Sequence, residues 1–90
     1  MPLAGVDPVA RLLARVRTSI ARYRGDDPGH RAYRLIRAAA IDGESEVIAI
    51  ATMTMLTRSV GVEHLHRFKF QMSRAEVLQA IDTALDWRAP

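Results

Sequence analysis

Apolar residues recur at helical spacing through most of the chain, and the first such segment covers residues 8 to about 24. The pair Asp7-Pro8 precedes it, which is typical of a capping residue followed by the first residue of a helix. Gly25 is placed where a helix ends. Along this segment, one apolar stripe is formed by Val9, Leu12, Leu13, Val16, Ile20 and Tyr23.

The same signal of Asp followed by Pro, at Asp27-Pro28, predicts a second helix over residues 28–41, which ends at Asp42-Gly43. Because residues 25–29, GDDPG, read as a short turn, we expect the first two helices to pack as an antiparallel hairpin. The residues expected to face inward on the second helix are Ala32, Leu35, Ile36, Ala39 and Ala40, with Tyr33 beside them.

The most apolar run, residues 47–56, contains ten residues without a charge and fits two structures. As a helix it is apolar on two sides and would be buried all round. A strand is favoured by its Thr, Val and Ile residues, which are enriched in strands. We favour the helix, because acidic residues precede the run and Arg58 follows it, as the helix dipole prefers. Ser45 or Asp42 would cap this helix, and Gly61 would end it.

Residues 62–72 are ambiguous as well. Val62, Leu65, Phe68 and Met72 fit a helix, whereas His64, His66, Phe68, Phe70 and Met72 alternate with other residues as in a strand. If both 47–56 and 64–72 were strands, they would form a hairpin packed on three helices, giving an α+β domain.

The last segment carries the clearest helix signal, because Ser73 and Glu76 have the spacing of a capping box. The apolar face that follows consists of Val77, Leu78, Ile81, Ala84 and Leu85, with Trp87 off this face. The sequence therefore predicts a mostly α fold, a small bundle of four to five helices. We expect residues 1–90 to form a single globular domain, with 1–6 as a flexible N-terminal arm.

Composition narrows the class of protein. Hydrophobic residues make up 49% of the 90, which excludes a disordered chain, and a core of this size is marginal, so self-association is expected. No stretch approaches the roughly 20 apolar residues of a membrane helix. There is no cysteine, and the N-terminal residues lack the pattern of a secretory signal. We expect a cytoplasmic protein that does not bind membranes.

Charge is distributed unevenly. Residues 1–41 contain eight arginines against three aspartates, a net +5, while residues 42–90 contain five basic against seven acidic residues, a net −2. Such asymmetry suggests an acidic partner for the first half. Twelve of the thirteen basic residues are arginine and alanine is frequent, which is typical of a GC-rich genome, as in some bacteria and their phages. The preference for arginine is therefore weak support for phosphate binding.

Candidate chemistry is sparse. The sequence has no G-x-S-x-G motif, no cysteine and no phosphate-binding glycine loop, so we do not expect an enzyme, a cofactor or a small-molecule substrate. His30, His64 and His66 lack a neighbouring carboxylate or cysteine that would complete a site, so we expect no bound metal.

Our first functional hypothesis is a small protein-interaction module that associates with itself and binds an unidentified target protein. Its support is the long uncharged run, with methionines that adapt to different partners. The residues predicted to bind a partner are Met53, Met55, Leu56, Phe68, Phe70 and Trp87.

The second hypothesis is a small basic regulator that binds nucleic acid. Its support is the +5 first half, together with a degenerate helix-turn-helix outline around residues 55–68, in which a turn containing Gly61 precedes exposed Arg and His. The residues predicted to contact phosphates are Arg11, Arg15, Arg22, Arg31, Arg34 and Arg37.

Overall fold

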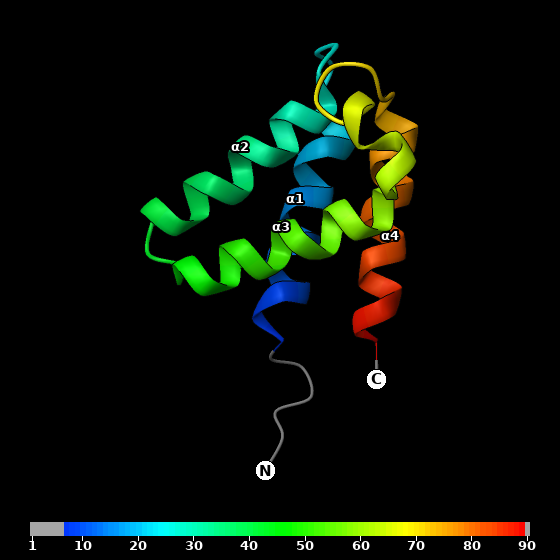
Figure 1. Cartoon of the computed structure of the whole chain (residues 1–90). Coiled ribbons are helices and arrows are strands. Elements are labelled where there is room, and N and C mark those ends of the chain that lie inside the picture. The colour runs from blue at the N-terminus through cyan, green and yellow to red at the C-terminus, as the bar shows by residue number, and fades with distance from the viewer. Residues whose placement is uncertain (1–6, 90) are drawn as a thin grey trace.

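The computed structural model describes residues 7–89, so the N-terminal arm predicted for residues 1–6 lies outside the described residues. The elements in chain order are α1 (Pro8–Arg22), α2 (Pro28–Ile41), α3 (Glu46–Val60), the 3₁₀ helix η1 (Val62–Arg67) and α4 (Arg74–Arg88) (Figure 1). The described chain contains no strand. The predicted mostly α bundle is confirmed, and the alternative hairpin of residues 47–56 and 64–72 does not form.

The four α-helices form two pairs, α1 with α4 and α2 with α3 (Figure 1). α1 packs most extensively against α4, and α3 lies across both, with α2 beside it. The two ends of α1 are tied to opposite ends of α4, because Asp7 binds Arg88 and the Tyr23 carbonyl accepts from Arg74. The antiparallel neighbour of α1 is thus α4, while its contact with α2, the neighbour expected from the short connection, is less extensive.

The hydrophobic core receives large side chains from all four α-helices. The apolar stripes predicted for the first and last helices face it, although Tyr23 lies beyond the end of α1 and is only partly buried. On α2, Ala32, Ile36 and Ala39 are buried as expected. The largest side chains that are fully buried belong to Leu12, Leu13, Ile20, Ile36, Leu56 and Ile81.

The turn between α1 and α2 explains why α1 ends at Arg22, two residues earlier than predicted. Tyr23 adopts an extended backbone (φ −72°, ψ 131°), and its hydroxyl donates a hydrogen bond to the Asp27 carboxylate. This hydrogen bond raises the pKa of Tyr23 and lowers that of Asp27. Because Asp27 is engaged there, it precedes α2 without capping it through its side chain.

Local signals set both ends of α3. The Ser45 hydroxyl accepts a hydrogen bond from the Val47 N–H (3.1 Å), and Gly61, with φ +90°, ends the helix. The buried side of α3 consists of Ala49, Thr52, Leu56 and Val60. Thr52 can be buried because its hydroxyl donates to the Ile48 carbonyl (2.7 Å).

Residues 62–72 form neither a strand nor an α-helix. The 3₁₀ helix η1 ends at Arg67, and a turn follows in which the N–H groups of Gln71 and Met72 both donate to the Arg67 carbonyl. This turn buries Phe68 and Met72 and leaves Phe70 exposed.

The start of α2 packs directly on that turn. The His30 N–H donates a hydrogen bond to the Lys69 carbonyl (3.0 Å). A Cβ at Gly29 would overlap the Phe68 carbonyl oxygen, so only glycine permits this approach of the two backbones.

Candidate functional site

The described helices leave one side of α3 uncovered. Val47 and Ile50 are 72% and 59% exposed, and Ile41, at the end of α2, is 82% exposed. Residues 42–45 connect α2 to α3, so these side chains gather around one end of the pair. We name this region, formed by Tyr33, Ala40, Ile41, Val47, Ile50 and Met53, the α2–α3 surface. Several exposed apolar side chains grouped in this way are typical of an interaction site.

A groove of about 520 Å³ runs between α2 and α3 within this surface. Its floor is apolar, formed by residues such as Ile36 and Ala49, and Met53 lies along it. Arg37 and Glu46 supply the charged groups of its lining, and the Arg37 guanidinium also lies over the Tyr33 ring, 5.6 Å from its centroid. The groove therefore combines an apolar floor with a charged margin, as many protein-binding sites do.

The residues predicted to bind a partner do not form one surface. Leu56 is 0% exposed and Phe68 is nearly enclosed, so the structure assigns both to the core and not to an interface. Met53 and Met55 are partly buried against that core, and only Met53 lines the groove.

The other two predicted residues, Phe70 and Trp87, are more than half exposed, and neither lines the groove between α2 and α3. Phe70 contacts His30 in the first turn of α2 (ring centroids 5.1 Å apart). The His30 ring in turn stacks on Tyr33 (ring centroids 6.3 Å apart), so Phe70 lies near the Tyr33 end of the α2–α3 surface, about 17 Å along α2 from Ile41. Trp87 belongs to the last turn of α4, and this end of α4 lies away from the connection between α2 and α3 (Figure 1).

Three of the six arginines predicted to contact phosphates lie close together in the structure. Three of the six residues, Arg15, Arg22 and Arg31, line one groove of about 330 Å³ between α1 and α2, together with Thr18 and Ser19. Within residues 7–89, none of the six arginines has a carboxylate within 4 Å. The Nε atom of Arg31 is buried and finds no hydrogen-bond acceptor among the described residues. We name Arg15, Arg22 and Arg31 the arginine groove.

The remaining three predicted arginines are exposed and lie outside this groove. Arg11 is one helical turn before Arg15 on α1, Arg34 is on α2, and Arg37 belongs to the other side of α2, in the groove shared with α3. By contrast, Arg17 pairs with Asp82 (2.5 Å) and Arg88 with Asp7 (2.8 Å). These guanidinium groups lower the pKa of the two aspartates.

The segment with the helix-turn-helix outline differs from that motif in its second element. The motif places an α-helix in the major groove of DNA, whereas residues 62–67 form a 3₁₀ helix of six residues. The outline at residues 55–68 therefore adds nothing to the arginine groove as support for nucleic-acid binding.

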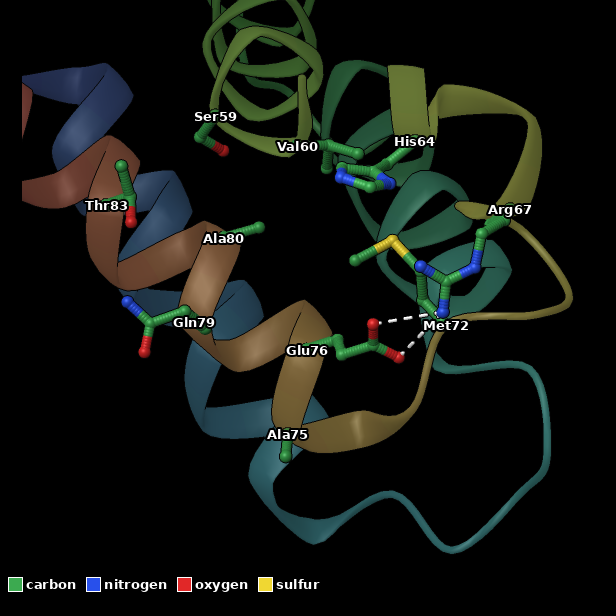
Figure 2. A pocket seen from close by; sticks show the side chains of 10 residues that line it. All are labelled: Ser59, Val60, His64, Arg67, Met72, Ala75, Glu76, Gln79, Ala80 and Thr83. Carbon is green, nitrogen blue, oxygen red and sulfur yellow. Dashed lines mark hydrogen bonds and ion pairs between the residues drawn. The ribbon is translucent and has the colours of Figure 1, made fainter. Parts of the chain in front are cut away.

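A third hollow, of about 400 Å³, lies between the end of α3, η1 and α4 (Figure 2). Glu76 points toward Arg67 and accepts two hydrogen bonds from its Nη2 (3.1 and 3.0 Å). Glu76 also accepts from the Ser73 N–H, and the backbone bond and the guanidinium together lower its pKa. Since this carboxylate is held as the partner of an arginine and as part of a helix cap, we assign it a structural role.

No helix among the described residues has both the length and the apolar composition needed to cross a membrane. No family model, curated protein or solved structure matches the chain.

Proposed function

We propose that the protein is a non-enzymatic interaction module that associates with itself, and through that assembly binds target proteins. The observation that supports this most directly is the exposure of Ile41, Val47 and Ile50 beside an apolar groove. Helix α3 is the most apolar of the chain, yet the described residues bury only one of its sides. Covering the other side would remove apolar area from water, which is the main favourable contribution to protein association.

Glutamate at Ile50 tests this proposal. The side chain is mostly exposed, so the substitution should change the free energy of unfolding of the monomer by less than about 0.5 kcal/mol. In an assembly it would place an unpaired carboxylate in an apolar contact. We expect the dissociation constant for self-association, measured by sedimentation velocity, to rise at least about tenfold.

The matched control is Ala14→Glu, which adds the same charge to an exposed position on α1. It should leave self-association unchanged. An assembly that resists Ile50→Glu as fully as Ala14→Glu would use another surface, and the proposal for the α2–α3 surface would be rejected.

Nucleic-acid binding is the second candidate, and the arginine groove favours it. Within residues 7–89 these three guanidinium groups have no carboxylate within 4 Å, and they could neutralise about three phosphates. Affinity for a labelled random duplex should then fall roughly 40-fold between about 50 and 200 mM salt, as measured by fluorescence anisotropy.

Replacing Arg15, Arg22 and Arg31 together with glutamine should abolish most of this binding and flatten its salt dependence. Arg34→Gln, on the exposed side of α2, is the control and should change the affinity little. If the wild-type protein shows no binding at low salt, or if the triple variant binds as well as the wild type, this second function is excluded.

A further inference from the structure

We infer that the exposed side of α3, which includes Val47 and Ile50 of the α2–α3 surface, binds a second copy of this chain, with the two α3 helices side by side and antiparallel. This inference rests on the proposed self-association and specifies its geometry. It is carried by the charge pattern along the exposed side of α3.

That exposed side runs the whole length of the helix. Val47, Ile50, Thr54 and Arg58 follow one another at spacings of three or four residues and are all exposed. In the middle of this side, Thr54 and the neighbouring Ala51 are short side chains, which allow a second helix to approach closely. The exposed side of α3 therefore has apolar side chains at its start, short side chains in its middle and a basic side chain at its end.

The two ends of α3 carry opposite charge. Asp42, Glu44 and Glu46 gather at the N-terminal end, and Arg58 lies in the last turn. Within the described part of the chain, none of these four side chains has an oppositely charged partner within 4 Å. The 15 residues of α3 separate the ends by about 20 Å, which exceeds the Debye length of roughly 8 Å at physiological salt. Each end therefore interacts with a partner independently of the other.

Only one orientation of a second copy places opposite charges together at both ends of α3. In a parallel pair, the three carboxylates of one chain would face the same three of the other. In an antiparallel pair related by a two-fold axis, Arg58 of each chain lies beside residues 42–46 of its partner, so the same attraction occurs twice. Ile50 and Ala51 then lie nearest the axis, and Val47 faces Thr54 of the second copy.

Two charge variants test this arrangement. One chain carries Arg58→Glu, and the other carries Glu44→Arg together with Glu46→Arg. Each variant alone would place like charges together at both ends of its homodimer, and we expect its dissociation constant to be at least about tenfold above the wild-type value at roughly 50 mM salt. Mixed in equal amounts, the two chains have opposite charges at both ends, so the mixed dimer should bind within about threefold of the wild type.

Circular dichroism of each variant establishes that the helices are intact before mixing. If the mixture binds no more tightly than the separate variants while the wild type still associates, the antiparallel arrangement is overturned and the proposed function stands. If Arg58→Glu alone associates like the wild type, the arrangement is likewise overturned. A wild-type chain that stays monomeric overturns the proposed function itself.

Discussion

Replacing Gly29 with alanine is expected to lower the free energy of unfolding by about 3 kcal/mol, toward the upper end of the costs of overpacking. The added Cβ would overlap the carbonyl oxygen of Phe68, and that oxygen belongs to the backbone, so the clash cannot be relieved by a side-chain rotation. Separation of the segments would strain the hydrogen bond from the His30 N–H to the Lys69 carbonyl. Urea unfolding followed by circular dichroism measures the change.

The sign of this effect is diagnostic, because helix propensity alone predicts the reverse. Alanine is favoured over glycine by about 1 kcal/mol within a helix. If Gly29 had no close contacts, the substitution would therefore stabilise the protein. Gly43→Ala is the control: its φ of +110° is strained for alanine, but no atom of the described residues lies within 4 Å of the added Cβ. We expect it to cost only about 1–2 kcal/mol. A stabilised Gly29→Ala variant would contradict the packing of α2 on residues 68–69.

Leu56→Ala is the second substitution with a large expected effect, a loss of about 2–5 kcal/mol in the free energy of unfolding. Leu56 is fully enclosed, so the shorter side chain would leave a cavity among the helices. Thermal and urea unfolding, at a concentration low enough to keep the chain monomeric, measure this loss.

Val47→Ala is the matched control, nine residues earlier on the same helix and on its exposed side. It should change the stability of the monomer by less than about 0.5 kcal/mol and weaken self-association instead. Equal losses from the two variants would mean that the two sides of α3 are wrongly assigned.

Most of the fold could be predicted because its helix ends are set by local signals. Asp7-Pro8, Ser45 and the capping box of Ser73 and Glu76 each act within four residues of sequence, and each lies at the start of a helix in the structure. The apolar stripe of α1 likewise depends only on the spacing of its own residues. Such signals can be recognised without knowing which helices pack against one another.

Residues 62–72 could not be predicted, because their conformation depends on a distant contact. The pattern fits a strand and a helix equally, and the observed turn is held against α2 at Gly29, some 40 residues away. The sequence signal for this contact is Gly29, which directly follows the proline that begins α2. By itself, a glycine there does not show which other segment packs against its backbone.

The candidate site was predicted only in part, for a similar physical reason. The sequence shows that α3 is apolar on two sides, but it does not reveal which side the other helices cover. The sequence therefore predicts Leu56 and Phe68 at an interface although they fill the core, and it does not single out Ile41, Val47 and Ile50 as exposed. The sequence identifies the six arginines as a group, but only three of them converge on one groove, because of how α2 is placed beside α1.

Sedimentation equilibrium of the wild-type chain, from about 5 to 500 µM in physiological salt, tests self-association most directly. We predict that the weight-average mass rises with concentration from the 10.0 kDa of one chain toward that of two. A mass that stays at 10.0 kDa over the whole range would contradict the account, because the α2–α3 surface would then remain uncovered in solution.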